Sequence, residues 1–501
     1  MLSRGKPPGI PAKPLYPPGP PGGNHIAYDG PAQDNAASNP LRNIAFRMAV
    51  GLVFILFSNI HQLLTYVLHV NLYLMYLFSV PTLLGVALAG GIQRTLRGRP
   101  AMYWTIFVVL LIAGVPFSSW RSGSMGALVP YLRIVFPMLF VIAGLTLTWR
   151  ECRVMMWAIA AGGVVIMSAA NLFRDTGAER LQIEFGTINN SNDYAVHLLF
   201  VLPFVIWVAL GSKSKALKLV AWGVVCFGIV LVLRTASRGA LIGLSAGALY
   251  WLLRGTMRQK MVLLVAGPVA AVALIAFVPR SALDRIVAFS AGEDNPSEDA
   301  RTSTEMRQYL LKQSIVYTLQ HPVFGVGMVQ FGEYEAERNA IIGNHGLGHD
   351  THNSYTQISV ECGMPALAFY VAAILSAFLM MNRVYRQAGT RPDCEDIRIT
   401  TFCIMLSMTM YCAGILFVNF GYFFYLPLMC SLVIAVSNAA TAEFSRPPSG
   451  HVEQQLHFAP QWRRSPDYNR GSGPRGVRGA APGVGQVSAG AIRTQRPYGG
   501  V

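Results

Sequence analysis

The sequence has few charged residues and lacks the patterns of a secreted or zinc-binding protein. Only 13% of its 501 residues are charged, whereas 53% are hydrophobic. A soluble domain usually has about twice this charged share. The seven cysteines form no CxxC pair and fall in apolar runs or short basic loops, which predicts buried thiols instead of a zinc site or a disulfide framework. An ordinary cytoplasmic enzyme, a disulfide-stapled secreted domain and a coiled coil are therefore excluded.

Both ends of the chain are rich in proline and glycine. Residues 1–43 contain no basic segment followed by an apolar one, so we expect no cleavable signal peptide. Residues 445–501 carry eight arginines, no lysine and two acids. Such segments cannot bury enough apolar surface to offset the entropy of ordering, so both are predicted to be disordered cytoplasmic tails. The arginine-rich tail could touch anionic lipid, with a solvated tail as the alternative, and we expect no specific nucleic-acid partner.

Long apolar segments occupy most of the chain between the two tails. They reach about 20 residues, the length at which a helix crosses a bilayer. Residues 44–438 are therefore predicted to form an all-α polytopic membrane domain with about twelve transmembrane helices. The predicted spans are roughly 44–66, 70–90, 101–117, 126–148, 154–172, 193–211, 216–233, 239–253, 261–279, 353–381, 398–418 and 420–438.

Lysine and arginine gather in every second loop between the predicted spans. The positive-inside rule assigns such loops to the cytoplasm, so we expect both termini on that side. One long loop at 280–352 then lies on the opposite side. The residues that set this orientation are Arg94, Arg97, Arg99, Arg150, Arg153, Lys213, Lys215, Lys218, Arg254, Arg258, Lys260, Arg383, Arg386, Arg391 and Arg398.

The long loop contains a segment with helical periodicity. Residues 304–320 predict a helix that ends at His321-Pro322, because proline breaks the interior of a helix. A long loop with its own helix is usually functional. The residues predicted to form the apolar face of this helix are Met306, Leu310, Leu311, Ile315 and Leu319.

Four arginines are predicted on the side opposite the basic loops. Arg238 lies at the mouth of a span, Arg133 lies about two turns into another, and Arg301 and Arg307 lie in the long loop. Charge at membrane depth is costly and usually faces a cavity or a partner. Several arginines on one rim would suit a phosphate or pyrophosphate, which their planar guanidinium groups bind bidentately. The alternatives are an end anchor for Arg238 and a solvated helix face for Arg307.

A histidine lies where the long loop returns to the membrane. His352 could act as a general base or orient an acceptor hydroxyl. It could instead cap the following helix together with Asn353 and Ser354. A metal site is a less favoured interpretation, because the glycines between its members do not favour a helix there. The members of that site would be His345, His349, Asp350 and His352.

An asparagine-rich segment leads into the predicted span at 193–211. Residues 186–193 read GTINNSND. Asn192 and Asp193 could contact sugar hydroxyls, while the alternative is a turn that caps the helix. Together the arginines, the histidine and this segment fall on one non-cytoplasmic rim, which is where a lipid-linked phosphorylated substrate would bind.

The order of these motifs is similar to that of a known family. The asparagine-rich segment is followed by SRGAL at 237–241, HPVFGVG at 321–327, HNSYTQ at 352–357 and ECG at 361–363. The chain thereby resembles the O-antigen ligase and O-antigen polymerase (Wzy-like) superfamily of bacterial membrane glycosyltransferases. The resemblance covers roughly residues 185–365 by motif and the whole membrane domain by span count, but neither tail.

This resemblance implies a helical fold similar to the C-type glycosyltransferases, in the bacterial inner membrane, with the site on the periplasmic side. Members of the family move a glycan from undecaprenyl pyrophosphate to an acceptor, with no metal or other cofactor. The acceptor is lipid A-core in ligases, another glycan repeat unit in polymerases, and a protein hydroxyl in the related O-oligosaccharyltransferases. The resemblance does not choose among these acceptors.

The resemblance also implies roles for particular residues. Arg238 and Arg307, which stands fourteen residues before His321, would bind the donor pyrophosphate, and His352 would act on the acceptor hydroxyl. These are the expected catalytic residues, with Arg301 as the alternative to Arg307, and in-line attack would invert the anomeric centre. The alternative function is a polysaccharide or solute transporter, although the sequence shows neither related halves nor midplane charges. The expected substrate-binding residues are Arg133, Asn192, Asp193, Arg301 and Asn353.

Overall fold

A computed structural model describes most of the chain between the two tails. All of the described residues belong to one unit, which ends at Pro448. Their regular elements are helices. In addition, Arg174 and Ile183 form an isolated β-bridge. The all-α class that the sequence predicts is therefore confirmed. The described residues are 39–174, 180–188, 190–257, 260–261, 264, 298–341 and 349–446.

Nine helical segments in the described part of the chain are long and apolar enough to cross a membrane. They are α2 (Pro40–Ser58), α6 (Arg99–Gly114) with η1 (Val115–Phe117), α7 (Arg121–Pro130) with η2 (Tyr131–Val135) and α8 (Met138–Leu145), α9 (Trp149–Leu172), α10 (Ser191–Gly211), α11 (Lys215–Arg234), α17 (Ser354–Ala388), η3 (Pro392–Cys394) with α18 (Glu395–Gly414) and η4 (Ile415–Phe417), and α19 (Tyr425–Ser445). The other helices are α3 (Ile60–Leu68), α4 (Leu74–Leu88), α5 (Gly91–Leu96), α12 (Arg238–Arg254), α15 (Glu298–Gln320) and α16 (Phe331–Ile341).

The prediction of about twelve spans was too high for the described residues. The segment at 70–90 forms the 15-residue α4, and the segment at 239–253 forms the 17-residue α12. The predicted span at 261–279 lies almost wholly outside the described residues. Hydropathy counts apolar residues but does not detect a helix end. Asn59, in the left-handed conformation at φ 48°, ends α2 inside the predicted span 44–66.

The first and last described helices extend slightly beyond the limits predicted for the membrane domain. Helix α2 begins at Pro40 and α19 ends at Ser445, whereas the sequence predicts limits at residues 44 and 438. The two predicted tails lie outside the described residues apart from their inner ends. Five of the seven free cysteines are buried as predicted, while Cys412 is half-buried and Cys226 is exposed.

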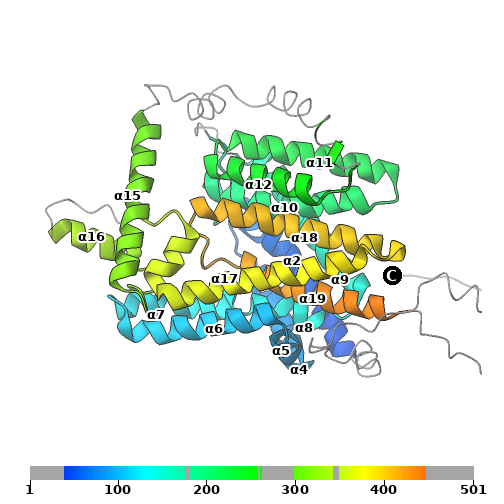
Figure 1. Ribbon diagram of the computed structural model, residues 1–501, viewed down its shortest axis with the longest axis horizontal. Helices are drawn as coiled ribbons and strands as arrows, with labels where there is room; N and C mark the ends of the chain where they lie inside the picture. The colour runs from blue at the N-terminus through cyan, green and yellow to red at the C-terminus, as the bar shows by residue number, and fades with distance from the viewer. Residues whose placement is uncertain are drawn as a thin grey trace, which may run out of the picture. The chain divides into compact units, whose positions relative to one another are not determined.

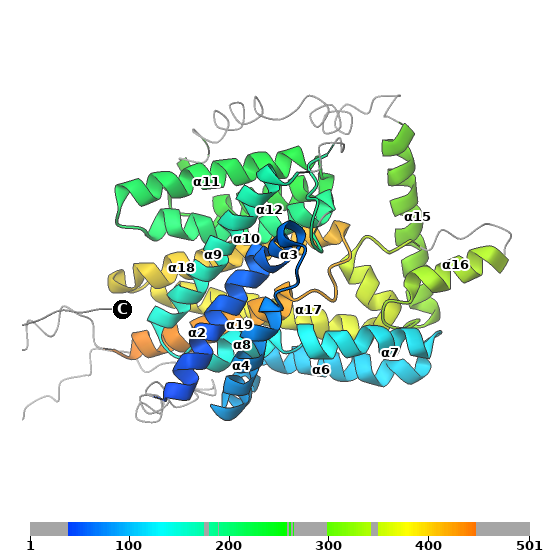
Figure 2. The ribbon, with the colours of Figure 1, turned by 180° about the vertical axis from the view of Figure 1, so that it is seen from behind.

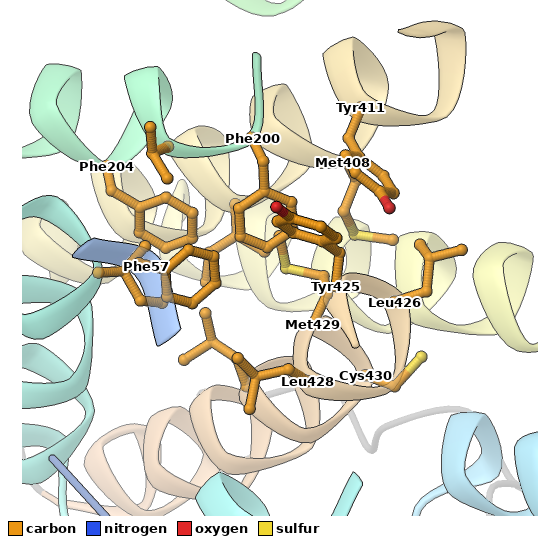
Figure 3. Packing of buried hydrophobic residues seen from close by; sticks show 14 of the residues in the cluster. Phe57, Phe200, Phe204, Met408, Tyr411, Tyr425, Leu426, Leu428, Met429 and Cys430 are labelled. Carbon is orange, nitrogen blue, oxygen red and sulfur yellow. The ribbon is translucent and has the colours of Figure 1, made fainter. Parts of the chain in front are cut away.

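The spans run side by side, and α15 lies across one end of their bundle (Figure 1). Helices α10 and α19 are the most enclosed, with 83% of their apolar windows buried, and α2 and α9 cover them on one side (Figure 2). Aromatic rings pack between these helices (Figure 3). The ring of Phe200 lies 5.2 Å from those of Phe57 and Tyr425, centroid to centroid. This packed centre fixes the helices that carry the outer loops.

The loops that carry the positive charges meet at the end of the bundle opposite α15 (Figure 1). Arg391 Nη1 donates to the carbonyl of Phe444 at 2.7 Å, and Arg153 forms an ion pair with Asp396 at 3.5 Å. The loops that the sequence assigns to one side therefore lie together in space. Their orientation with respect to the membrane stays a prediction.

Helix α15 buries only part of the face that the sequence predicts, since Leu310 is buried and Met306 is half-buried. The buried face includes Ser314 and Thr318, whose hydroxyls each donate to a backbone carbonyl within the helix. Because hydrogen-bonded hydroxyls can be buried at little cost, the apolar pattern alone located only part of the buried face. The predicted residues that are instead exposed are Leu311, Ile315 and Leu319.

Helix α17 is broken near its start. Gly363 has φ 86° and ψ 170°, which are not helical angles, and Pro365 follows it. Residues 354–362 therefore run in a different direction from the rest of α17 and lie beside α15 (Figure 1). The sequence predicts one continuous span at 353–381, because hydropathy carries no information about the backbone angles of a glycine.

Candidate functional site

Arg238 is the first residue of α12, at the end of the bundle that α15 crosses. A three-residue turn joins α12 to α11, and Ala236 in this turn has the left-handed φ of 47°. Gly239 lets α12 approach η4 closely, because a Cβ atom at this position would lie 2.5 Å from the Cβ of Phe417. The turn and this close contact hold the half-buried Arg238 at the mouth of the bundle.

Arg307 lies on α15 and is half-buried. Burial lowers the pKa of its guanidinium, and the nearby charge of Arg238 lowers this pKa further. The two guanidinium groups therefore lie within electrostatic range of each other. Both stay charged at neutral pH, because arginine is not deprotonated in proteins. Two neighbouring cations can together bind a group with several negative charges, such as a pyrophosphate.

His352 lies in the short connection that leads into α17 and has the left-handed φ of 51°. Hydrogen bonds of its neighbours hold this connection on both sides. Thr351 Oγ1 donates to Asn419 Oδ1 at 2.9 Å, and Ser354 Oγ donates to the carbonyl of Val418 at 2.7 Å. Both acceptors belong to the connection between η4 and α19, so His352 is fixed against that segment.

The imidazole of His352 is half-buried and lies near Arg307. Burial lowers the pKa of His352 most, Arg307 lowers it further, and Asp350 acts in the opposite direction. The side chain is therefore neutral at physiological pH, since the ordinary pKa of histidine is about 6.5. A neutral imidazole can accept a proton from a hydroxyl group. The fold thus brings together Arg238, Arg307 and His352 from three separate segments, while their roles stay predictions.

Asn192 and Asp193 lie in the first turn of α10, at the same end of the bundle. The side-chain oxygen of Asn192 accepts a hydrogen bond from Arg180 Nη2 at 2.8 Å. Arg180 Nε in turn donates to the carbonyl of Thr235 at 2.8 Å. Asn192 therefore helps to hold the turn that precedes α12. Asp193 lies within electrostatic range of Asp350, the acid beside the histidine of the site.

The other three expected substrate-binding residues lie in different surroundings. Asn353 caps α17, since its side-chain oxygen accepts from the N–H groups of Tyr355 and Thr356, which agrees with the capping alternative for this segment. Arg133 lies exposed in η2, and because α7 begins at Arg121 it is about three turns into its span instead of two. Arg301 belongs to α15, and its side chain lies outside the described part of the chain.

Two residues near the site were not expected there from the sequence. Asp350 was considered only as a metal ligand, yet it acts electrostatically on His352. A carboxylate two residues before a histidine is a signal that could have identified it. Arg180 offers no such signal, because its contacts to α10 and to the turn before α12 arise only when distant segments meet.

A metal centre has no candidate within the described residues, where no three His, Cys, Asp or Glu side chains are grouped closely enough. The metal alternative included His345, which lies outside those residues. That alternative is therefore not tested.

The fold and the site define a class: a polytopic α-helical membrane protein with two arginines and a neutral histidine at one end of its spans. A family model described as O-antigen ligase matches residues 222–371, a segment that contains all three residues. No curated protein matches the chain. Residues 222–371 therefore form an O-antigen ligase domain, and this match supports the O-antigen ligase (Wzy-like) family. This confirms the family that the motifs predicted.

Proposed function

We propose that this protein transfers a glycan from undecaprenyl pyrophosphate to an acceptor hydroxyl at the periplasmic face of the bacterial inner membrane. The observation that carries the proposal is that Arg307 lies within electrostatic range of both Arg238 and His352. They come from α12, α15 and the connection before α17. The family match supports a membrane glycosyltransferase of the ligase or polymerase type.

In this proposal Arg238 and Arg307 bind the pyrophosphate of the donor. Negative charge grows on the pyrophosphate oxygen as its bond to the anomeric carbon breaks. Two fixed guanidinium groups in a partly buried site stabilise that charge more than water would. Because pyrophosphate is already a good leaving group, no group of the protein has to protonate it strongly.

His352 receives the proton of the acceptor. The acceptor oxygen bonds to the anomeric carbon from the side opposite the leaving pyrophosphate, so the anomeric centre is inverted. The hydroxyl proton passes to the imidazole, which its low pKa keeps neutral and ready to accept. The products are the glycosylated acceptor and undecaprenyl pyrophosphate, and no metal takes part in these steps.

Replacement of Arg238 by alanine tests the donor site. We expect glycan transfer by the membrane-embedded chain to fall by roughly a hundredfold or more, as when one transition-state donor is removed from an active site. Arg398→Ala is the matched control, because Arg398 is also near a span end but pairs with Glu395 at the opposite end of the bundle. Full transfer by the Arg238→Ala variant at normal membrane levels would refute the site.

The acceptor class is open to a genetic test. If the protein is a ligase, deletion of its gene leaves long glycan chains on the lipid carrier without attachment. If it is a polymerase, deletion leaves single repeat units. Unchanged surface and lipid-linked glycans after deletion would contradict both forms of the proposal.

A further inference from the structure

The HPVFGVG and ECG motifs, which have no role in the proposed chemistry, meet in the structure. Backbone hydrogen bonds join them: Val326 N donates to the carbonyl of Val360 at 2.8 Å, and Gly327 N donates to the carbonyl of Glu361 at 2.9 Å. Met364 N donates back to the carbonyl of Pro322 at 2.8 Å. We call this contact, between residues 321–329 and 359–364, the clamp.

Glycines fix the register of the clamp. Gly325 has φ 68° and Gly363 has φ 86°, and both angles are disfavoured for other residues. A Cβ atom on Gly325 would lie 2.3 Å from the carbonyl carbon of Glu361. A Cβ atom on Gly363 would lie 2.1 Å from the carbonyl oxygen of Val323. The two backbones therefore approach as closely as glycine alone allows.

Glu361 is the ionisable residue at the centre of the clamp. Its side chain is 2% exposed, and its Oε2 accepts from the backbone N–H of Val329 at 3.0 Å and from the hydroxyl of Tyr422 at 2.7 Å. A buried carboxyl group is tolerated only with such partners. Through them one side chain connects the segment after α15, the break in α17 and the turn before α19.

The clamp holds α15 from its C-terminal end. Thr318 Oγ1 and Ser359 Oγ share a hydrogen bond of 2.9 Å. Around them a small core packs α15 and the segment after it against the first part of α17, and its residues are Leu310, Tyr317, Val326, Phe331 and Val360.

Arg307 stands far from the clamp along α15, although Leu310 attaches the helix to the small core closer to it. Arg307 lies thirteen residues before Gln320, the last residue of α15, which is about 20 Å along the helix axis. A tilt of about 5° at the clamp would move Arg307 by roughly 2 Å over that length. Displacements of about 1 Å in a catalytic group can lower a rate by roughly a hundredfold. The position of Arg307 over His352 is therefore sensitive to the clamp.

We propose that Glu361 is a positioning residue that holds α15, and with it Arg307, in place over His352. It does not touch the substrate. The effect on catalysis rests on the proposed function, whereas the effect on α15 does not. The two are therefore measured separately.

Distance measurement between spin labels tests the position of α15. Labels go on cysteines at the exposed positions Gln308 on α15 and Ser122 on α7, with Cys226 and Cys412 replaced by serine because neither is buried. In the full chain in lipid nanodiscs, we expect Glu361→Ala to broaden or shift the distance distribution.

The matched control is Ser407→Ala. Ser407 is buried and donates to the carbonyl of Phe200 at 2.7 Å, between α18 and α10. This variant also loses a buried hydrogen bond, but it leaves the clamp intact. We expect its distance distribution and its transfer rate to match those of the unaltered chain.

Kinetics of the unlabelled variants test the consequence for catalysis. We expect Glu361→Ala to lower kcat by roughly tenfold to a hundredfold with a smaller change in the KM for the acceptor. The reason is that the displaced guanidinium of Arg307 no longer stabilises the transition state. Glu361→Gln keeps an oxygen that accepts from Val329, so it should restore most of the rate and the narrow distance distribution. If Glu361→Ala does not insert, Tyr422→Phe, which removes one donor to Glu361, supplies the same comparison with a smaller change.

Two outcomes would overturn the proposal. One is a distance distribution in Glu361→Ala that is the same as in Ser407→Ala. The other is a displaced α15 with an unchanged kcat. If the unaltered chain transfers no glycan at all, the proposed function fails, while the distance measurement still decides whether Glu361 holds α15.

Discussion

The two ends of the helix bundle hold their arginines in different ways. At the end with the basic loops, arginines pair with acids, as Arg391 does with Asp393 at 2.9 Å. At the end that α15 crosses, Arg307 lies instead near another arginine, Arg238, and near His352. Arg391 thereby holds its loop, whereas the neighbouring charges of Arg238 and Arg307 add to a positive field that attracts an anion. The surroundings of Arg391 and Arg307 therefore differ.

The largest expected effect is that of His352, at the end that α15 crosses. Its replacement by alanine should lower glycan transfer by about a hundredfold to ten-thousandfold, because a general base is lost. His69→Ala is the matched control, since His69 also has a left-handed backbone, at φ 54°, in an exposed loop. Initial rates in proteoliposomes measure both variants. Equal rates for the two would remove His352 from the site.

Lysine substitutions separate charge from geometry at the two ends. Lysine keeps the positive charge of Arg238 or Arg307 but cannot bind an anion with a planar fork. We expect either change to lower transfer by about tenfold to a hundredfold, the value of one or more hydrogen bonds between charged groups. Arg391→Lys, at the opposite end, should leave transfer unchanged. If lysine at positions 238 and 307 left transfer unchanged as at position 391, positive charge alone would be sufficient for transfer.

Acid should inactivate the protein through His352. Because the folded protein lowers the pKa of His352, transfer should persist below the ordinary value of about 6.5 and fall as pH drops through the lowered pKa. Asp350 raises this pKa, so Asp350→Asn should move the acid midpoint to a still lower pH. The pH dependence of kcat/KM measures the shift, and a shift toward higher pH would contradict the assigned interaction.

Alanine substitutions at two glycines test the difference between a crowded and an open helix surface. Gly239→Ala should cost about 1–3 kcal/mol and displace Arg238, because an added Cβ overpacks the contact with Phe417. Gly223, on α11, has nothing within 4 Å of an added Cβ. Gly223→Ala should therefore leave stability unchanged or raise it by up to about 1 kcal/mol. Thermal unfolding in detergent measures both, and equal effects would contradict the close approach at Gly239.

The smallest expected effect is that of Asn192→Ala. This change removes one acceptor of Arg180 and should cost about 1 kcal/mol of stability. Thermal unfolding measures this loss, and the KM for the donor is measured beside it. A higher KM with unchanged stability would instead favour direct contact of Asn192 with the glycan.

The elements that the sequence predicted well depend on local patterns. The helix expected at 304–320 is α15, which ends at Gln320 where His321-Pro322 was expected to stop it. The helix expected after Arg238 begins at Arg238 in the structure. Apolar composition and a proline act on the chain within a few residues, so they can be read without any knowledge of the fold.

The elements that the sequence predicted poorly depend on contacts between distant segments. The buried face of α15 was predicted only in part, because Ser314 and Thr318 can be buried when their hydroxyls form hydrogen bonds within the protein. The break in α17 at Gly363 matches the close approach of Val323 from the long loop. Neither partner is near in sequence, so no local pattern identifies them.

By itself the sequence determined that this chain is an all-α membrane protein with an O-antigen ligase domain, because hydropathy and motif spacing are properties of the linear chain. Only the tertiary structure decided that Arg307 lies near both Arg238 and His352 and that the histidine has a lowered pKa. Charge interaction and burial depend on distance through space, and that distance is set by the turn before α12, the clamp beneath α15 and the hydrogen bonds around His352.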